Sequence, residues 1–512
     1  MPETFLQEPL SLLSRADASR KIANGNLKGE NKSAFGQYMT PAAVASFMAS
    51  LFPTPTDQNI RLLDPGAGVG SLTSAFVEHL CKTKYVYRIH VDAYEIDPVM
   101  RLYLEKNLDL CKTTATKSGG LVEWRIVSED FITEASKKEA SFNSLWPENV
   151  KRYTHCIMNP PYKKISSVSH HRACLRSVGI ETVNLYSAFV ALSLLLLEKG
   201  GQLVTIIPRS FCNGPYYRPF REFLLKHAAI RHIHLFRSRN KAFKEDKVLQ
   251  ENVIFALEKG ALQKGITVST STDDTFTDTS ISEYQFREIV HEDDKELFIH
   301  IPASPENDLL DDSSLFNNSF SELGLHVSTG PIVDFRMKDQ LKIMPESGTV
   351  PLLYPCHFKK QAMQWPIGDG KKPNAILCNK DTEKFLYPNG FYTVVRRFSS
   401  KEERRRIVAS VVDPTVVGGA EKIGFENHLN VFHENKEPLT EALAKGLYVF
   451  LNSTAVDDKF RQFSGHTQVN ATDLKTMKYP SRKTLMELGK WAIQKRELTQ
   501  DMIDEEMERI SE

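Results

Sequence analysis

The chain has 512 residues, of which 41% are hydrophobic and 25% charged, a globular composition that excludes wholesale disorder. Lys and Arg total 65 against 64 Asp and Glu, a formal net charge of +1. The protein as a whole is therefore not basic in the way a histone is, and any nucleic-acid partner is expected to bind a local basic patch. At about 150 residues per domain, the length suggests about three domains.

The cysteines, the hydropathy pattern and the histidine spacing argue against a secreted, membrane-spanning or metal-binding protein. The seven cysteines include no CxxC pair and no zinc-ligand spacing, as expected of a reduced, cytoplasmic protein. The first residues lack the features of a signal peptide, and the most apolar run, Leu185 to Leu197, is shorter than the about 20 residues of a membrane span. We expect a soluble protein with no membrane partner. Because the histidines have no thiols or carboxylates at ligand spacing, we predict no metal site.

The first half of the chain has the rhythm of an α/β domain. Residues 1–30 are expected to form a helical lead-in, and residues 31–260 alternate short apolar runs with helical patterns, which is typical of a parallel sheet. Buried helices are predicted around Leu72 to Leu80 and over Leu185 to Leu197. The predicted strands are Ile60–Leu63, Ile89–Tyr94, Glu123–Val127, Thr154–Met158, Gln202–Ile207, Ile230–Leu235 and Asn252–Leu257.

The composition changes near residue 260. Residues 261–320 are polar and acidic and are predicted to be a connecting segment with a short strand or two. Residues 321–480 are rich in Pro, Gly and aromatic residues and lack a βαβ rhythm, so we expect a second domain there. Residues 481–512 carry mixed charges at helical spacing, which predicts an exposed C-terminal helix.

A glycine-dense turn follows the first predicted strand, in the sequence Asp64-Pro-Gly-Ala-Gly-Val-Gly70. Gly66, Gly68 and Gly70 let the chain turn sharply and let a ligand approach the backbone. The spacing is neither the dinucleotide pattern GxGxxG nor a phosphate-binding loop ending in Gly-Lys-Ser/Thr. An anionic Asp64 at the strand end suits a cationic ligand better than a pyrophosphate. S-adenosylmethionine, which carries an ammonium and a sulfonium, is therefore the expected cofactor.

Acidic residues also follow the next two predicted strands. Glu95 is expected to accept hydrogen bonds from a ribose diol, whereas Asp97 is predicted to cap a helix. After the third strand, Asp130 is expected to bind the adenine amino group of the cofactor, and the ring of Phe131 to pack on the purine. Because Glu95 and Asp130 follow the two strands that come next in the chain after the one ending in the glycine turn, we expect the three features to lie together and to form an adenosine site.

The tetrapeptide Asn159-Pro160-Pro161-Tyr162 follows the fourth predicted strand. Its prolines stiffen the turn and remove two backbone donors, so the carbonyl groups there act as acceptors. The Asn159 side-chain oxygen and the Pro160 carbonyl can each accept one hydrogen of a planar amino group and aim its lone pair at a methyl sulfonium. Tyr162 can stack on the base. Positioning and electrostatics would then supply most of the rate.

In this order, the motifs resemble those of the gamma-class DNA adenine-N6 methyltransferases, the modification enzymes of bacterial type II restriction systems. The resemblance covers residues 31–260 and implies a Rossmann-like, S-adenosylmethionine-dependent methyltransferase domain followed by a C-terminal α+β target-recognition domain. It implies that Gly36, Thr40 and Pro41 help to close over the methionine moiety, and that Phe243 stacks on the base opposite Tyr162. The base would be flipped out of duplex DNA to reach the site.

The resemblance leaves the substrate open, because the same tetrapeptide occurs in enzymes that methylate protein glutamine or RNA bases. Asn at position 159 is consistent with adenine, whereas Ser would favour cytosine-N4. A non-catalytic DNA-binding protein that retains the fold is a further alternative. The long C-terminal half and the intact motifs favour DNA adenine methylation, with any cognate restriction endonuclease on a separate chain.

Two basic clusters in the second half fit a DNA-binding role. One combines Arg396, Arg397, Lys401 and Arg404 to Arg406 with neighbouring aromatic residues. The other places Lys359, Lys360, Lys371 and Lys372 around Trp365. Such residues neutralise phosphates and position a duplex.

Overall fold

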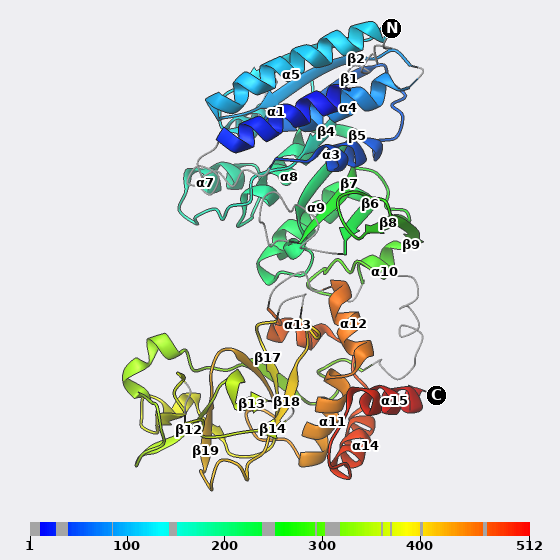
Figure 1. The fold of residues 1–512 in the computed structure, drawn as a ribbon. Coiled ribbons are helices and arrows are strands. Elements are labelled where there is room, and N and C mark those ends of the chain that lie inside the picture. Colours follow the sequence, from blue (N-terminus) through cyan, green and yellow to red (C-terminus); the bar gives the residue numbers. More distant parts are fainter. Residues whose placement is uncertain are drawn as a thin grey trace, which may run out of the picture. The chain divides into compact units, whose positions relative to one another are not determined.

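The computed structural model forms two compact units, Met1–Ala303 and Ser304–Glu512 (Figure 1). The structure describes residues 11–26, 39–83, 85–142, 151–237, 251–291, 294–302, 318–359, 362–368, 371–399, 403–463 and 468–511.

The described part of the first unit is built on one nine-stranded sheet. Strand β7 runs antiparallel to both of its neighbours and β9 runs antiparallel to β8, whereas the other pairs are parallel. Each of the predicted strands lies within an observed one. In spatial order the strands are β3 (Leu121–Val127), β2 (Arg88–Tyr94), β1 (Asn59–Pro65), β4 (Tyr153–Met158), β5 (Leu197–Pro208), β7 (Asn252–Lys259), β6 (Ala228–Phe236), β8 (Ile266–Ser271) and β9 (Ser280–Tyr284).

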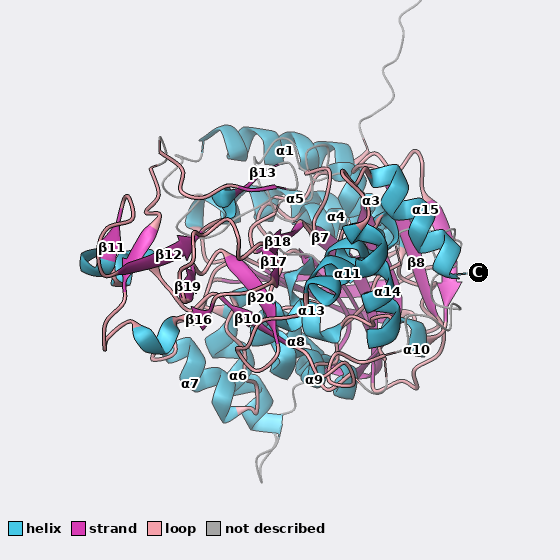
Figure 2. Cartoon of the chain, turned by 90° about the horizontal axis from the view of Figure 1, so that it is seen from below, coloured by secondary structure: helices cyan, strands magenta, loops and turns pink. Residues whose placement is uncertain are grey.

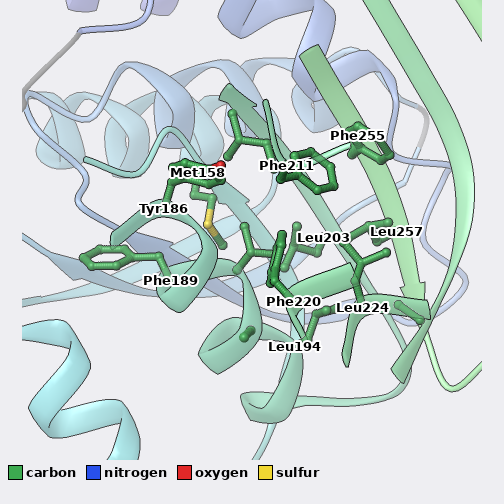
Figure 3. Close-up of a cluster of buried hydrophobic side chains, with 14 of the residues drawn as sticks. Met158, Tyr186, Phe189, Leu194, Leu203, Phe211, Phe220, Leu224, Phe255 and Leu257 are labelled. Atoms are coloured by element: carbon green, nitrogen blue, oxygen red, sulfur yellow. The ribbon is translucent and has the colours of Figure 1, made fainter. Parts of the chain in front are cut away.

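Helices cover both faces of this sheet, because successive strand residues point to opposite sides. In β4, Ile157 packs in one core, whereas Cys156 and Met158 pack in the other. The Ile157 core includes residues of α1 (Leu12–Asn26), α3 (Ala42–Ser50), α4 (Ser71–Cys81) and α5 (Pro98–Lys117). The opposite core includes α6 (Phe131–Phe142), α7 (His170–Ser177), α8 (Leu185–Leu196) and α9 (Arg218–His227); Figure 3 shows its aromatic and leucine side chains interdigitating.

The first unit continues beyond residue 260, where we expected the α/β domain to end. Strand β8 pairs in parallel with β6, and β9 and the short helix α10 (Phe286–Ile289) follow. The connecting segment thus contains two short strands, as predicted, and they extend the sheet because β8 pairs with the free edge of β6.

The described second unit contains two larger sheets and a small hairpin (Figure 2). The four-stranded sheet has the order β10 (His326–Thr329), β20 (Leu429–His433), β17 (Tyr392–Arg396) and β18 (Ala409–Val412). The five-stranded sheet has the order β11 (Leu341–Lys342), β15 (Ala375–Leu377), β12 (Thr349–Leu353), β19 (Lys422–Phe425) and β16 (Tyr387–Pro388), and β13 (Phe358–Lys359) pairs with β14 (Ala362–Met363). In β17, Val394 packs in a core with the five-stranded sheet, and Val395 in a core with the helices.

The prediction of a single exposed helix at the C-terminus is wrong. The segment forms two helices, α14 (Arg482–Ile493) and α15 (Gln500–Ser511), and each contributes buried apolar residues to the helical core. That core also includes α11 (Glu441–Leu451), α12 (Thr454–Phe463) and α13 (Ala471–Thr476). Glycine permits close packing here, because a Cβ on Gly489 would lie 1.6 Å from the Ala442 carbonyl oxygen. Apart from the buried Glu506, the charged residues of these two helices are exposed or partly exposed, so charge counting concealed the buried stripes.

These observations confirm the predicted fold class, an α/β domain followed by an α+β domain. In the part of the chain that the structure describes, no helix is long and apolar enough to cross a membrane.

Candidate active site

A cavity of about 420 Å³ opens beside the ends of β1, β2, β3 and β4 in the first unit. The carboxyl ends of parallel strands share one sheet edge, where open α/β sheets bind ligands. The predicted residues that line this cavity are Thr40, Gly66, Gly68, Glu95, Asp130, Phe131, Asn159 and Pro161.

The glycine turn is held to the neighbouring strand by backbone hydrogen bonds. Gly66 N and Ala67 N donate to the Tyr94 carbonyl at 2.9 and 2.8 Å, and Gly68 N donates to Glu95 Oε2 at 2.8 Å. Gly68 has a φ of +57°, and a Cβ there would meet no described atom within 4 Å. The turn is therefore preformed and leaves space beside its backbone.

Two predicted cofactor residues have structural roles at helix starts. Gly70 precedes α4 with a φ of +84°, and a Cβ there would lie 2.8 Å from a Leu104 methyl group. Pro41 precedes α3 in extended conformation. Neither residue is among those that line the cavity.

Asp64 is fully buried at the end of β1 and does not line the cavity. Its Oδ2 accepts a hydrogen bond of 2.6 Å from the Thr73 hydroxyl, whereas Oδ1 has no hydrogen-bond partner among the described residues. Burial raises the pKa of Asp64 to about 7. This carboxylate would be stabilised by a cation placed near it.

Glu95 has both carboxylate oxygens in contact with the backbone. In addition to the bond from Gly68, its Oε1 accepts from Asp97 N at 2.8 Å, and burial raises its pKa. The predicted cap is confirmed, because Asp97 Oδ1 accepts from Val99 N and Met100 N at the start of α5.

Asp130 is fixed by its neighbours and remains partly exposed. Its Oδ1 accepts from the backbone and hydroxyl of Thr133, both at 2.9 Å, and lies 3.2 Å from His171 Nε2. Burial opposes ionisation, but the hydrogen bonds from His171 and Thr133 outweigh it and lower the pKa of Asp130 to about 2. The hydrogen bond with Asp130 in turn raises the pKa of His171. Phe131, at the start of α6, packs against Phe189 at a ring distance of 4.8 Å.

The tetrapeptide places an oriented carboxamide in the cavity. Asn159 Nδ2 donates to the Thr40 hydroxyl oxygen at 3.1 Å, and the Tyr162 hydroxyl donates to Asn159 Oδ1 at 2.9 Å. Asn159 and Pro161 line the cavity, whereas Pro160 is buried and neither it nor Tyr162 is among the lining residues. The Tyr162 ring packs edge to face with Tyr186.

Sequence reasoning missed residues that reach the cavity from helices and from the segment after the tetrapeptide. Lys163, Lys164 and His171 add basic groups, and Phe189 of α8 adds an aromatic wall. Asn107, buried on α5, supports the glycine turn by donating to the Val69 carbonyl at 2.7 Å. Of these residues, only Lys163 and Lys164 could have been found from the sequence, because they directly follow Tyr162.

The predicted residues Gly36 and Phe243 lie outside the described residues. So do Lys360 and Lys401 of the basic clusters.

The predicted arginine cluster of the second unit divides in the structure. Arg406 is fully buried, with its backbone bound to Asp457 and its guanidinium over the Phe460 ring. Arg405 donates to the Ser453 carbonyl. These two arginines stabilise the unit's interior, so we exclude them from the expected phosphate-binding surface.

Arg397 is partly exposed and lies beside an exposed ring. Its guanidinium donates to the Asn427 carbonyl at 3.3 Å and to Gln468 Oε1 at 3.4 Å. Its guanidinium lies 5.9 Å from the Phe398 ring, which is 42% exposed, and His428 lies 4.9 Å from the same ring. We name these three residues the recognition patch. Of the second basic cluster, Lys372 pairs with Asp334 at 2.9 Å, and Trp365 is partly buried.

Comparisons with known proteins give the family. The family model for the Eco57I restriction-modification methylase matches residues 82–243. The Type II methyltransferase M.BsuBI of Bacillus subtilis is 50% identical over 500 residues, which are 98% of each chain. The Type II methyltransferase M.PstI of Providencia stuartii is 44% identical over 492 residues, 96% of this chain and 95% of that protein.

Among solved structures, the cryo-EM structure of the DrdV–DNA complex has a TM-score of 0.51 at 13% identity. The match covers 93% of this chain and 59% of that one, and it shows a likeness of fold. The two full-length relatives carry more information. They show that the chain belongs to the Type II restriction-modification methyltransferases and is a DNA methyltransferase.

Proposed function

We propose that the enzyme transfers a methyl group from S-adenosylmethionine to N6 of an adenine in a short site of duplex DNA, in the bacterial cytoplasm. The observation that carries this proposal is the shared cavity. Asn159, whose carboxamide would hold the amino group, lines the same cavity as Gly66 and Gly68, whose turn would hold the methyl donor.

The residues that line the cavity, together with the buried Asp64 next to the glycine turn, fit this cofactor. The unpartnered Oδ1 of buried Asp64 provides negative charge for an ammonium group, and each Glu95 oxygen can accept a further hydrogen bond from a ribose hydroxyl. The contacts of Asp130 fall on Oδ1, so its Oδ2 would accept from the adenine amino group, with Phe131 against the purine. When bound, S-adenosylmethionine supplies an electrophilic methyl carbon on a positively charged sulfur.

Asn159 and Pro160 would orient the amine that receives the methyl group. The Asn159 side-chain oxygen and the Pro160 carbonyl each accept one amine hydrogen, which directs the nitrogen lone pair toward the methyl carbon. The nitrogen lone pair held in this direction would accept the methyl group that the cofactor supplies, and the methylated amine would release one of its hydrogens to water as a proton. Pre-oriented acceptors cost no reorganisation during the reaction.

Base flipping would deliver the adenine, with Tyr162 on one face and Phe243 on the other. The sheet supports the second assignment through its connections. Asn252 at the start of β7 pairs with Pro208 at the end of β5, and Val253 pairs with Leu235 near the end of β6. The residues that flank the Phe243 segment thus belong to the same sheet edge as Asn159.

The second unit would recognise the DNA sequence, and the recognition patch supports this role. Arg397 pairs a cation with an exposed aromatic ring, and His428 adds a third group able to contact a base or phosphate. Any cognate restriction endonuclease would be a separate chain.

The test is a methyl-transfer assay with tritiated S-adenosylmethionine, offering duplex DNA, RNA and protein in parallel. Nucleoside analysis of the product should give N6-methyladenine from duplex DNA alone. N4-methylcytosine would refute the adenine assignment, and methylated RNA or glutamine would support the alternative substrates. No transfer to any of them by a folded, cofactor-binding protein would favour a non-catalytic DNA-binding role.

A further inference from the structure

The Asn159 carboxamide is held from two sides by hydroxyl groups that come from distant parts of the chain. Thr40 accepts from Nδ2 at 3.1 Å across 119 residues of sequence, and Tyr162 donates to Oδ1 at 2.9 Å. The Tyr162 hydroxyl also lies 3.3 Å from the Ile206 carbonyl of β5. Each end of the amide therefore meets a partner of matching polarity.

Thr40 is well placed to act as an anchor. Its exposed fraction is 4%, and it lies two residues before α3, whose Val44, Ala45 and Met48 are fully buried against the sheet. A hydroxyl on such a rigid support restricts rotation of the amide about its terminal torsion, which is otherwise broad. An amide oxygen can accept two hydrogen bonds, so the bond from Tyr162 is compatible with an amine donor.

We propose that Thr40 is a positioning residue for the catalytic amide and not a cofactor ligand, with the Tyr162 hydroxyl as its counterpart on the oxygen side. This inference rests on the proposed function and changes the role that the sequence suggested for the Thr-Pro segment. The segment would act on the acceptor amine through Asn159. Loss of the Thr40 hydroxyl should then slow transfer without weakening cofactor binding.

The decisive comparison is Thr40→Val with Thr40→Ser. Valine keeps the shape of threonine and removes the hydroxyl, and serine keeps the hydroxyl. Thr40→Val should lower the single-turnover rate about tenfold, the equivalent of one lost hydrogen bond. Its Kd for S-adenosylmethionine, measured by calorimetry, should change less than about twofold, and Thr40→Ser should restore most of the rate.

Thr205→Val is the matched control. Thr205 is also fully buried, on β5, and its hydroxyl has no hydrogen-bond partner within the described ranges. The same substitution there should leave both rate and Kd unchanged, which separates loss of an anchor from the general effect of a buried methyl group.

Tyr162→Phe tests the second anchor, because it keeps the ring and removes the hydroxyl. It should also slow transfer about tenfold, and the double variant Thr40→Val/Tyr162→Phe should slow it about a hundredfold, because the two hydroxyls hold opposite ends of the amide. A wild-type rate for Thr40→Val, or a loss explained entirely by a raised cofactor Kd, would overturn the inference. Absence of adenine methylation by the wild type and Thr205→Val would instead refute the proposed function.

Discussion

The two units use their polar residues in different ways. In the first unit, Thr40, Glu95, Asp130 and Asn159 come from widely separated segments and line one cavity at one sheet edge. In the second unit, residues of one sequence cluster separate, since Arg397 is partly exposed and Arg406 is fully buried. A parallel sheet collects strand ends at one edge, whereas short antiparallel strands and loops impose no such convergence. Sequence proximity is therefore a poor guide to a site in the second unit.

The largest expected effect tests the convergence in the first unit. Asn159→Ala should lower the methyl-transfer rate by on the order of 10³-fold, because it removes an acceptor aligned with the reacting amine. Cofactor affinity should change little. Single-turnover assays and calorimetry would measure both, and near-normal turnover would mean that the shared cavity is not the site of the chemistry.

Asp64→Asn should have opposite effects on stability and on binding. The folded pKa of Asp64, about 7, is above its ordinary value of 3.8. The cofactor-free protein therefore loses stability as pH rises from about 4 to 7, where this carboxyl ionises in the unfolded chain but stays protonated in the fold. The variant should be more stable at pH 8 by about 4 kcal/mol, and the difference should vanish near pH 4. It should also bind S-adenosylmethionine more weakly. Equal urea midpoints at pH 8 would contradict the buried, unpartnered carboxylate.

Arg406→Ala tests whether buried arginine in the second unit is structural. The variant should lose about 3 kcal/mol of unfolding free energy, because the buried guanidinium packs on the Phe460 ring and attracts the buried carboxylate of Asp473. Arg404→Ala, at an exposed position of the same cluster, should change it by less than about 0.5 kcal/mol. Urea denaturation would measure both, and similar effects at the two positions would remove the distinction between surface and interior.

Arg397→Ala should weaken binding to the target duplex about tenfold, or 1–2 kcal/mol, and reduce the salt dependence of binding by about one phosphate contact. Lys495→Ala is the control, because Lys495 also lies over an aromatic ring, that of Trp491, next to α14. Fluorescence anisotropy at several salt concentrations would compare the two. Equal affinities would show that the recognition patch does not contact DNA.

The smallest effect is expected at the rim of the cavity. His171→Ala removes one contact of Asp130 and should raise the cofactor Kd a few-fold at pH 6. The paired imidazole has a raised pKa, so its charge is present below that pKa and lost as pH rises through it. The difference from wild type should therefore shrink by pH 8.5, and a pH-independent difference would assign the effect to packing.

The parts of this structure that sequence predicts are those determined locally. Alternation and flanking turns located the first unit's strands, and Gly66, Gly68, Glu95 and Asn159 follow strand ends directly. Long-range contacts were not predictable. The approach of Thr40 to Asn159, the pairing of His171 with Asp130 and the support of Val69 by Asn107 depend on helix packing, which leaves no motif in the chain.

The separate cores of the two units have an evolutionary consequence. The residues that line the cavity belong to the first unit, and the second unit is stabilised by hydrophobic clusters of its own. Mutations that change the surface of the second unit therefore need not alter the cavity of the first unit, and selection can act on the two units separately. Under the proposed role of the second unit in DNA recognition, a lineage can in this way acquire a new target site while inheriting its chemistry unchanged.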